Sequence, residues 1–348
     1  MKLRTLLFGT ISMALGLTAC ASPAPADPTT APVSATAVPA LRELAGSAGM
    51  GFGTAINVDL LGNQTYADIA ATQFDSVTAE NVMKWEQIEP TQGTYDWTKA
   101  DRLVDFATSY GQTVRGHTLI WHNQTPAWLD AAAAAMTDAE FADLVKKHVQ
   151  DEVAHFKGKI WQWDVVNEAL DDGGALRDTI FRQRLGDDYI ASVFTWAHEA
   201  DPDALLFYND YGMENGGSKT DAALTMAKDL KARGVPIDGV GFQAHYDTAY
   251  GVPSGLTDVM KRFTDAGLKV AVTEMDVRGQ ADAATVAQYY TTTVDACRAA
   301  GCLSFTVWGI SDKDSWIPYS FPNQTPYCLY DAAYQPNPWF ADVAAALK

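Results

Sequence analysis

The sequence predicts an α/β fold, a single (β/α)8 TIM barrel. Short runs of β-branched and aromatic residues alternate along the chain with amphipathic stretches of helical periodicity. Polar or aromatic residues stand at the C-terminal ends of successive strand-like runs, which is where such a barrel carries its chemistry. After residue 40 the composition shows no second break, and the length of the chain suits one large barrel domain.

Eight strands are expected, most of them short apolar runs that end at a polar or aromatic residue. Because the strands alternate with helices, they are expected to be parallel and to end at the same mouth of the barrel. In chain order the expected strands cover 52–56, 76–80, 114–120, 162–167, 205–210, 239–245, 269–274 and 303–308.

Two of the intervening helices are well marked. The segment 100–110 carries an apolar stripe that ends at Tyr110, and the glycine that follows is a common helix terminator. The segment 138–156 begins after Thr137, and Glu140 completes the pattern of a capping box. Both segments are long enough to cover the outside of a barrel strand.

Residues 1–19 are expected to form a signal peptide of the lipoprotein type. A basic start is followed by an apolar run over 6–17, which is too short to span a bilayer. The run ends in Leu-Thr-Ala-Cys, which resembles a bacterial lipobox, so we expect Cys20 to be lipidated and to become the mature N-terminus. The alternative is ordinary secretory cleavage after Ala21.

Residues 20–40 are rich in Ala, Pro, Ser and Thr and are expected to form an extended tether. The catalytic domain is then expected to cover 41–348. This organisation predicts an exported lipoprotein at the cell surface or facing the periplasm, or else a secreted protein. A lipid anchor would be the only contact with the membrane.

The formal net charge of −18 argues against nucleic acid as a partner, because nucleic-acid binding depends on basic residues that neutralise phosphates. It fits an enzyme that acts on a neutral or weakly charged substrate. The sequence has no metal-type His or Cys spacing, no phosphate-binding loop and no serine-hydrolase motif. We therefore expect no metal and no cofactor. The oligomeric state is left open by the sequence, with a monomer as the default expectation.

The cysteines predict one disulfide. Cys297 and Cys302 are five positions apart in a chain that is expected to be exported, which favours a bond between a helix end and the next strand over two free thiols. Cys328 is left over and is expected to be buried and inert.

Two glutamates are the candidate catalytic residues. Glu168 follows the fourth expected strand and Glu274 ends the seventh, so their side chains are expected to face one another across the barrel mouth. Glycoside hydrolysis requires such a pair: one carboxyl group protonates the leaving oxygen, and the other attacks or stabilises the anomeric carbon. A single strand-end glutamate is more often a salt-bridge partner, so the hypothesis depends on the pair.

Six segments carry a resemblance to a known family. They read TAENVMKW at 78–85, GHTLIWHNQ at 116–124, WDVVNEAL at 163–170, GFQAHY at 241–246, VTEMDV at 272–277 and VWGISDKDSW at 307–316. Together and in this order they resemble the glycoside hydrolases of family 10, which are mostly endo-β-1,4-xylanases. The resemblance extends from about 51 to 340 and thus covers nearly the whole expected domain.

The resemblance implies a role for each matching residue. Glu168 matches the general acid/base and Glu274 the nucleophile of a retaining mechanism, which passes through a covalent glycosyl-enzyme. Asn167 matches the residue that binds the 2-hydroxyl of the sugar being cleaved, and His245 the histidine that hydrogen-bonds the nucleophile. The other matching sugar-binding positions are Glu80, Asn81, Lys84, His117, Trp121 and Gln124 on the glycone side, Asn209 and Tyr211 on the aglycone side, Gln243, and the covering tryptophans Trp308 and Trp316.

The resemblance therefore implies hydrolysis of internal β-1,4 bonds of xylan. A β-1,4-glucanase or a chain-end-acting enzyme of the same architecture is the nearest alternative, because the sequence does not specify how the tryptophans exclude the extra hydroxymethyl group of glucose. A surface protein that binds glycans without cutting them is a weaker alternative, since such a protein would be expected to lack one of the two glutamates.

Overall fold

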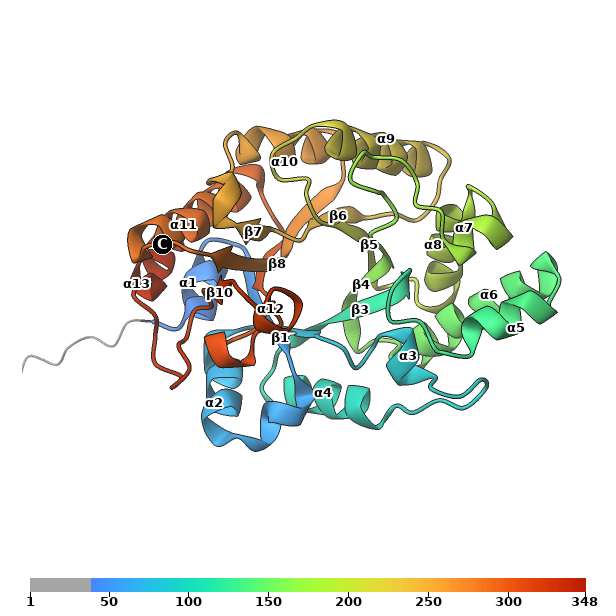
Figure 1. The fold of residues 1–348 in the computed structure, drawn as a ribbon, viewed down its shortest axis with the longest axis horizontal. Coiled ribbons are helices and arrows are strands. Elements are labelled where there is room, and N and C mark those ends of the chain that lie inside the picture. Colours follow the sequence, from blue (N-terminus) through green and yellow to red (C-terminus); the bar gives the residue numbers. More distant parts are fainter. Residues whose placement is uncertain (1–38) are drawn as a thin grey trace, which may run out of the picture. The chain divides into compact units, whose positions relative to one another are not determined.

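The computed structural model describes residues 39–348, so the expected signal peptide, Cys20 and nearly all of the expected tether lie outside the described residues. The barrel strands form a ring around the centre of Figure 1. Within residues 39–348, eight strands pair in parallel to make this ring. They are β1 (Gly51–Ile56), β2 (Ser76–Ala79), β3 (Thr113–Trp121), β4 (Ile160–Asn167), β5 (Leu205–Asp210), β6 (Gly239–Phe242), β8 (Lys269–Gly279) and β9 (Ser304–Val307).

The last strand closes the barrel. β9 pairs in parallel with β8, where Val272 lies opposite Phe305, and also with β1, where Gly51 lies opposite Ser304. Every other barrel strand pairs with its neighbours in chain order, β8 directly following β6 in the ring. The predicted (β/α)8 barrel is thereby confirmed.

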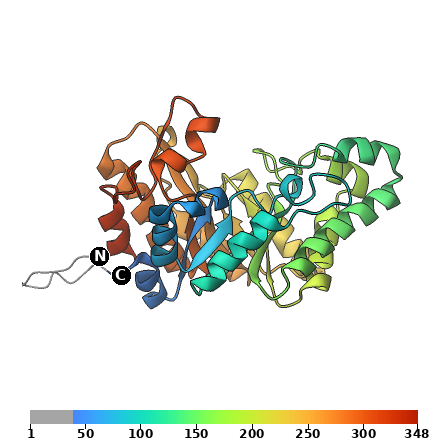
Figure 2. The same ribbon diagram turned by 90° about the horizontal axis from the view of Figure 1, so that it is seen from below.

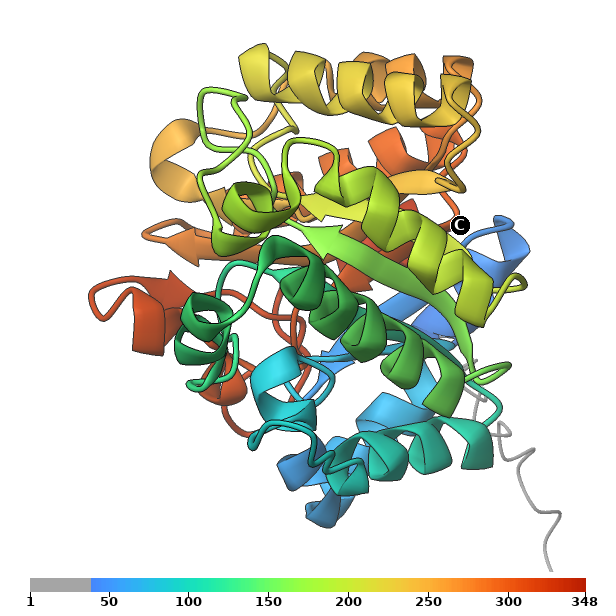
Figure 3. The same cartoon turned by 90° about the vertical axis from the view of Figure 1, so that its right-hand side faces the viewer.

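Helices surround the ring of strands and run beside them in Figures 1, 2 and 3. None of the helices within residues 39–348 is long and apolar enough to cross a membrane. The helices are α1 (Leu41–Ser47), α2 (Gln64–Gln73), α3 (Trp85–Ile88), α4 (Thr98–Ser109), α5 (Leu129–Ala135), α6 (Asp138–His155), α7 (Ile180–Leu185), α8 (Tyr189–Ala200), α9 (Ser218–Ala232), α10 (Leu256–Asp265), α11 (Ala283–Ala300), α12 (Ile317–Ser320) and α13 (Phe340–Ala346), with short 3-10 turns at Val58–Gly62, Thr248–Tyr250 and Asp312–Asp314.

The core lies between the helices and the outer face of the barrel and continues into the barrel interior. Phe52 on β1 stacks between Phe74 and Phe305, with ring centroids 5.6 and 5.7 Å apart. All three rings are fully buried. Aromatic packing therefore accompanies the backbone pairing that joins the first strand to the last, and it adds to the burial that stabilises the closed ring.

The helix predictions are right except at one end. Thr137 and Glu140 form the predicted capping box of α6, in which the Glu140 carboxylate accepts the Thr137 N–H at 2.7 Å. Tyr110 was predicted on the buried stripe of α4, and this is wrong. The helix ends at Ser109, so Tyr110 turns outward against Phe106 and is 47% exposed.

The expected strand over 239–245 is in fact two strands. β6 ends at Phe242, and Ala244 has a φ of 59°, which an extended strand does not accommodate. The chain resumes as β7 (His245–Asp247), which pairs with β8 beyond residue 274, so that His245 lies opposite Asp276. β8 runs on past the expected end to Gly279, where it pairs with β10 (Thr325–Pro326).

The predicted disulfide between Cys297 and Cys302 is present. It joins the end of α11 to the residues before β9 across Gly301, whose φ of 73° ends the helix. Cys328 is a buried free cysteine, as expected, and burial raises the pKa of its thiol.

Candidate active site

A cavity of about 950 Å³ opens at the C-terminal ends of the barrel strands. Such a volume is large enough for an extended ligand with several polar contacts. Its wall contains both candidate catalytic residues and every predicted sugar-binding residue except Asn209, namely Glu80, Asn81, Lys84, His117, Trp121, Gln124, Asn167, Glu168, Tyr211, Gln243, His245, Glu274, Trp308 and Trp316.

Asn209 is the exception because its side chain points into the barrel interior and is fully buried. The prediction that it lines the aglycone side of the cavity is wrong. Its amide nitrogen instead donates to Glu274 Oε1 at 2.7 Å and to Asn167 Oδ1 at 2.8 Å, and its oxygen accepts from Thr273 Oγ1 at 2.7 Å. Asn209 therefore acts on Glu274 from beneath the cavity floor.

Glu274 is held as an anion. It is only 4% exposed, and burial alone would raise the pKa of its carboxyl group. The hydrogen bond from His245 Nε2 at 3.1 Å, together with the nearby His117, the charge on His245 and the guanidinium of Arg115, outweighs burial and lowers the pKa of Glu274 to about 2. The side chain is thus ionised throughout the ordinary pH range.

His245 is held as the matching cation. Burial would lower the pKa of its ring, but Asp276 and Glu274 on either side of the ring raise that pKa to about 10. His245 Nδ1 lies 2.8 Å from Asp276 Oδ1, and the second oxygen of Asp276 accepts from the indole N–H of Trp316 at 2.6 Å. The register of β7 on β8 sets this geometry, because it aligns His245 with Asp276.

Glu168 has a different set of partners. Its Oε2 accepts from the indole N–H of Trp121 at 2.8 Å, and its Oε1 accepts from the amides of Gln243 at 3.1 Å and Asn167 at 3.3 Å. All three donors are uncharged, and within residues 39–348 no ion pair involves the Glu168 carboxylate. The side chain lines the open cavity and is only partly buried.

A chain of hydrogen bonds connects the two carboxylates under the cavity floor. It runs from Glu274 through Asn209 and Asn167 to Gln243, whose amide nitrogen lies 3.2 Å from Asn167 Oδ1 and 3.1 Å from Glu168 Oε1. Because each amide is shared between two partners, the two carboxylates are fixed relative to one another.

Strained backbone is concentrated at the barrel mouth. Among residues 39–348, four residues other than glycine have a positive φ, and three of them are Gln124 (48°), Glu168 (54°) and Ala244 (59°), all in or beside the cavity wall. Such a conformation costs free energy in a residue with a Cβ and is typical of functional sites. At Glu168 it is held by the backbone N–H, which donates to the Asn209 carbonyl at 2.8 Å.

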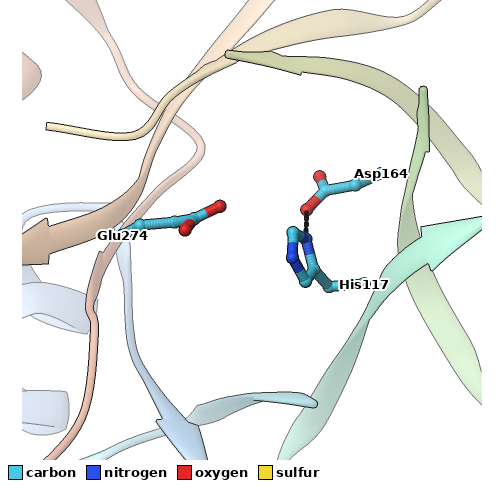
Figure 4. A group of neighbouring side chains, drawn as sticks. All are labelled: His117, Asp164 and Glu274. Atoms are coloured by element: carbon cyan, nitrogen blue, oxygen red, sulfur yellow. Dashed lines mark hydrogen bonds and ion pairs between the residues drawn. The ribbon is translucent and has the colours of Figure 1, made fainter. Parts of the chain in front are cut away.

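His117, Asp164 and Glu274 form a cluster of possible metal ligands, and their ligand atoms lie within 4.8 Å of one another. Figure 4 shows His117 and Asp164 on neighbouring strands, with Glu274 facing them across the barrel. His117 Nδ1 lies 2.8 Å from Asp164 Oδ2, and the guanidinium of Arg115 lies 3.4 Å from the same oxygen. A fixed cation thus already neutralises Asp164, and the group is better described as an ion-pair network that orients His117 than as a metal site.

Lys84 links the polar residues on the glycone side. Its ammonium donates to Gln124 Oε1 at 2.6 Å and to Asn81 Oδ1 at 2.9 Å, and it lies 4.9 Å from the ring centroid of Trp121. Burial lowers the pKa of Lys84 and raises the pKa of the neighbouring Glu80. These side chains present fixed donors and acceptors of the kind that sugar hydroxyls need.

Tyr211 is fixed in the opposite wall. Its hydroxyl donates to Asp172 Oδ1 at 2.6 Å and accepts from the guanidinium of Arg177 at 2.7 Å. The ammonium of Lys219 lies 3.4 Å from the ring centroid. A rigid aromatic ring in this position offers a flat surface to a pyranose.

Several residues of the site were not predicted. The additional residues of the cavity wall are Glu86, Asn123, Gly212, Arg278, Tyr319, Ser320 and Phe321. A signal was available for Arg278 and also for Asp276, the partner of His245, because side chains two apart on a strand share a face. Asp276 and Arg278 follow Glu274 at this spacing, so an extended seventh strand would have indicated both.

The closed barrel and the pair of carboxylates at its mouth define the class of protein, a (β/α)8 glycoside hydrolase. The family model described as glycosyl hydrolase family 10 matches residues 40–346. The chain therefore belongs to glycosyl hydrolase family 10.

Relatives and solved structures agree with this assignment. Endo-1,4-beta-xylanase D of Talaromyces funiculosus is 37% identical over 306 residues, covering 85% of this chain and 74% of that protein. Endo-1,4-beta-xylanase B of Thermotoga neapolitana is 36% identical over 285 residues, covering 80% of this chain and 82% of that protein. The crystal structure of native xylanase 10B from Thermotoga maritima superposes with a TM-score of 0.84 at 36% identity, covering 88% of this chain and 98% of that one. Xylanase 10B from Thermotoga petrophila, solved in complex with xylobiose, has a TM-score of 0.83 at 35% identity, covering 88% and 97%.

Proposed function

We propose that this protein is a retaining endo-β-1,4-xylanase in which Glu274 is the nucleophile and Glu168 the general acid/base. The observation that carries the proposal is the asymmetry of the pair: Glu274 is buried and ionised by a charged partner, whereas Glu168 is more exposed and has only neutral donors. The xylanase relatives named above support xylan as the substrate.

In the first step, Glu168 donates its proton to the glycosidic oxygen while a carboxylate oxygen of Glu274 bonds to the anomeric carbon. The carbon–oxygen bond to the leaving sugar breaks, and a glycosyl ester on Glu274 remains. In the second step, Glu168 removes a proton from water, the water oxygen bonds to the anomeric carbon, and Glu274 leaves as the carboxylate. Two displacements at one carbon restore the original configuration.

The surrounding residues fit this sequence of steps. His245 and Asn209 each hold one oxygen of Glu274, so the attacking group is oriented before substrate binds. The Asn167 amide lies between the two carboxylates, where a 2-hydroxyl of the reacting sugar would bind. Trp308 and Trp316 pack edge-on against His117 and His245, respectively, and are thereby fixed in the wall of the cavity.

The test is release of reducing sugar from xylan and carboxymethylcellulose in parallel, with the Glu274→Ala variant as the blank. We expect rapid release from xylan that the variant lacks, and little release from the cellulose derivative. Release only from carboxymethylcellulose would overturn xylan as the substrate and keep the mechanism. Folded protein with no activity on either polymer would favour a glycan-binding role instead.

We also propose that the chain is exported and anchored through a lipid on Cys20, with the Ala/Pro/Ser/Thr-rich segment as a tether and the catalytic domain acting as a monomer. The support is the sequence alone: the lipobox-like end of the apolar run and the composition of 20–40. Cells that express the full chain and a Cys20→Ala variant would be grown with a labelled fatty acid. We expect label and membrane association only with Cys20 present, and unlabelled wild-type protein would exclude the anchor.

A further inference from the structure

Arg278 is a cationic residue of the cavity wall that the proposed mechanism does not use. It lies on β8 on the same face as Glu274 and Asp276, because side chains two apart on a strand point the same way. The side chain lines the cavity and is 15% exposed.

Within the described part of the chain, the guanidinium of Arg278 forms a long ion pair but no side-chain hydrogen bond. Its one ion-pair partner within residues 39–348 is Asp247, whose Oδ2 lies 3.6 Å from Nε, beyond hydrogen-bonding distance. That oxygen already accepts from the amide of Gln324 at 2.8 Å, and Asp247 Oδ1 accepts from the Ala249 N–H at 2.9 Å. In the described part of the chain, the buried Nε of Arg278 donates no hydrogen bond.

Phe321 holds the guanidinium in place. The central carbon of the guanidinium lies 4.2 Å from the ring centroid of Phe321, which follows α12 and itself lines the cavity. Phe321 in turn packs edge-on against Trp316, with centroids 5.6 Å apart. The flat cation is thus fixed on an aromatic face, while its terminal nitrogens remain available to a ligand.

Two other cations near the cavity already donate side-chain hydrogen bonds to the protein. Lys84 donates to two amide oxygens, as described above. Arg177 donates to the Glu168 carbonyl at 3.1 Å and to the Tyr211 hydroxyl at 2.7 Å. Arg278 differs from both, because within residues 39–348 its side chain donates no hydrogen bond and its guanidinium is left for a ligand.

We infer that Arg278 and Phe321 form a subsite for a carboxylate carried by the substrate, which for a xylanase means a uronic acid side group of an acidic xylan. The inference rests on the proposed function and names a substrate class for it. A planar carboxylate matches the guanidinium fork. Glu80 and Glu86 also line the cavity and repel an anion, so an acidic side group binds at Arg278 while the neutral xylose backbone occupies the rest of the cavity.

The test compares three polymers: unsubstituted xylan, glucuronoxylan, and the same glucuronoxylan with its carboxyl groups chemically reduced to alcohols. The enzymes are the wild type, Arg278→Met, Arg278→Lys and Arg262→Met. The last is the matched control, because it also removes one positive charge, but from the outer helix α10, where Arg262 pairs with Asp221. The readout is kcat/KM on each polymer at low and at high salt.

We expect the wild type and Arg262→Met to cleave glucuronoxylan roughly fivefold better than its reduced form, and high salt to weaken this preference. Arg278→Met should lose the preference, with a larger loss of kcat/KM on glucuronoxylan than on unsubstituted xylan, while Arg278→Lys should retain part of the preference.

The inference is wrong if the wild type treats the native and reduced polymers alike, or if Arg278→Met keeps the preference. It is also wrong if Arg278→Met and Arg278→Lys lose activity equally on all three polymers, because the residue then only supports the cavity wall. Failure of the proposed function is a separate result, namely a wild type that does not cleave unsubstituted xylan.

Discussion

Glu274 and Glu168 line the same cavity, but the protein binds them with different kinds of partner. Glu274 receives a charge-assisted hydrogen bond from His245, whose ring is flanked by a second carboxylate, and Arg115 lies nearby. Glu168 receives hydrogen bonds from one indole and two amides. The comparison indicates how a barrel gives two roles to one type of side chain. A fixed cation keeps Glu274 ionised, whereas neutral donors position Glu168.

The largest expected effect is the loss of kcat when either glutamate is removed, and two kinds of substrate distinguish the nucleophile from the acid/base. Glu274→Ala should lose at least roughly 10⁴-fold in kcat on every substrate, because no group remains to form the glycosyl ester. Glu168→Ala should lose a similar factor on xylan but should still release phenol rapidly from an aryl xylobioside with a good leaving group, which needs no protonation. Stopped-flow measurement of phenol release distinguishes them. Equal losses on the aryl substrate would contradict the assignment.

The next effect concerns the charged partner. In His245→Asn the imidazolium is lost, so the pKa of Glu274 should rise from about 2 towards its ordinary value of 4.5. Because Glu274 must be ionised to attack, the acid limb of the kcat/KM profile should move to higher pH, and kcat should fall roughly 100-fold. The matched variant is Gln243→Met, which removes a neutral donor from Glu168. If the acid limb moves in Gln243→Met but not in His245→Asn, the charged partner does not control the ionisation that limits catalysis, and the contrast drawn between the two glutamates is wrong.

Asn209 provides a smaller test on the Glu274 side. Since its amide holds Glu274 Oε1 from outside the cavity, Asn209→Ala should lower kcat roughly tenfold and leave KM within about twofold. Tyr211→Ala, which removes a residue of the cavity wall, should instead raise KM. Steady-state kinetics on xylo-oligosaccharides distinguish the two patterns. A raised KM in Asn209→Ala would indicate that Asn209 binds the substrate directly on the aglycone side.

The smallest effect is on stability. Glu274 contributes stability above its unfolded pKa of 4.5 that is lost as pH falls towards about 2. His245, whose pKa is raised from 6.5 to about 10, contributes stability below pH 6.5 that is lost as pH rises through about 10. The pair should therefore stabilise the fold most between pH 4.5 and 6.5. Thermal denaturation of His245→Gln should show a smaller loss of Tm between pH 7 and 10 than the wild type shows.

Much of this molecule could be predicted from the sequence, because its signals are local. The alternation of strands and helices indicated the barrel, and Glu168 and Glu274 stand directly at strand ends. Asn209 could not be placed correctly, since the stagger of the strands decides which inward-pointing side chains lie at the barrel mouth and which lie below it. The break at Ala244 was also invisible, because a positive φ at alanine is imposed by tertiary contacts.

The partners of the carboxylates are harder to predict for the same reason. The pairing of His245 with Asp276 depends on the register between β7 and β8, which the apolar pattern does not specify. Arg278 and Phe321 meet because β10 brings the segment after α12 onto the end of β8. Contacts of this kind join segments that are far apart in the chain, so only the folded structure reveals them.

The pairing of β9 with β1 has a consequence for the biogenesis of this enzyme. The first strand has an unpaired edge until residues 304–307 have been made, so the ring cannot close on a partial chain. Such a non-local contact slows folding and makes it cooperative. Closure by the last strand also means that few fragments of the barrel are stable, because truncation before β9 removes a partner of both β1 and β8.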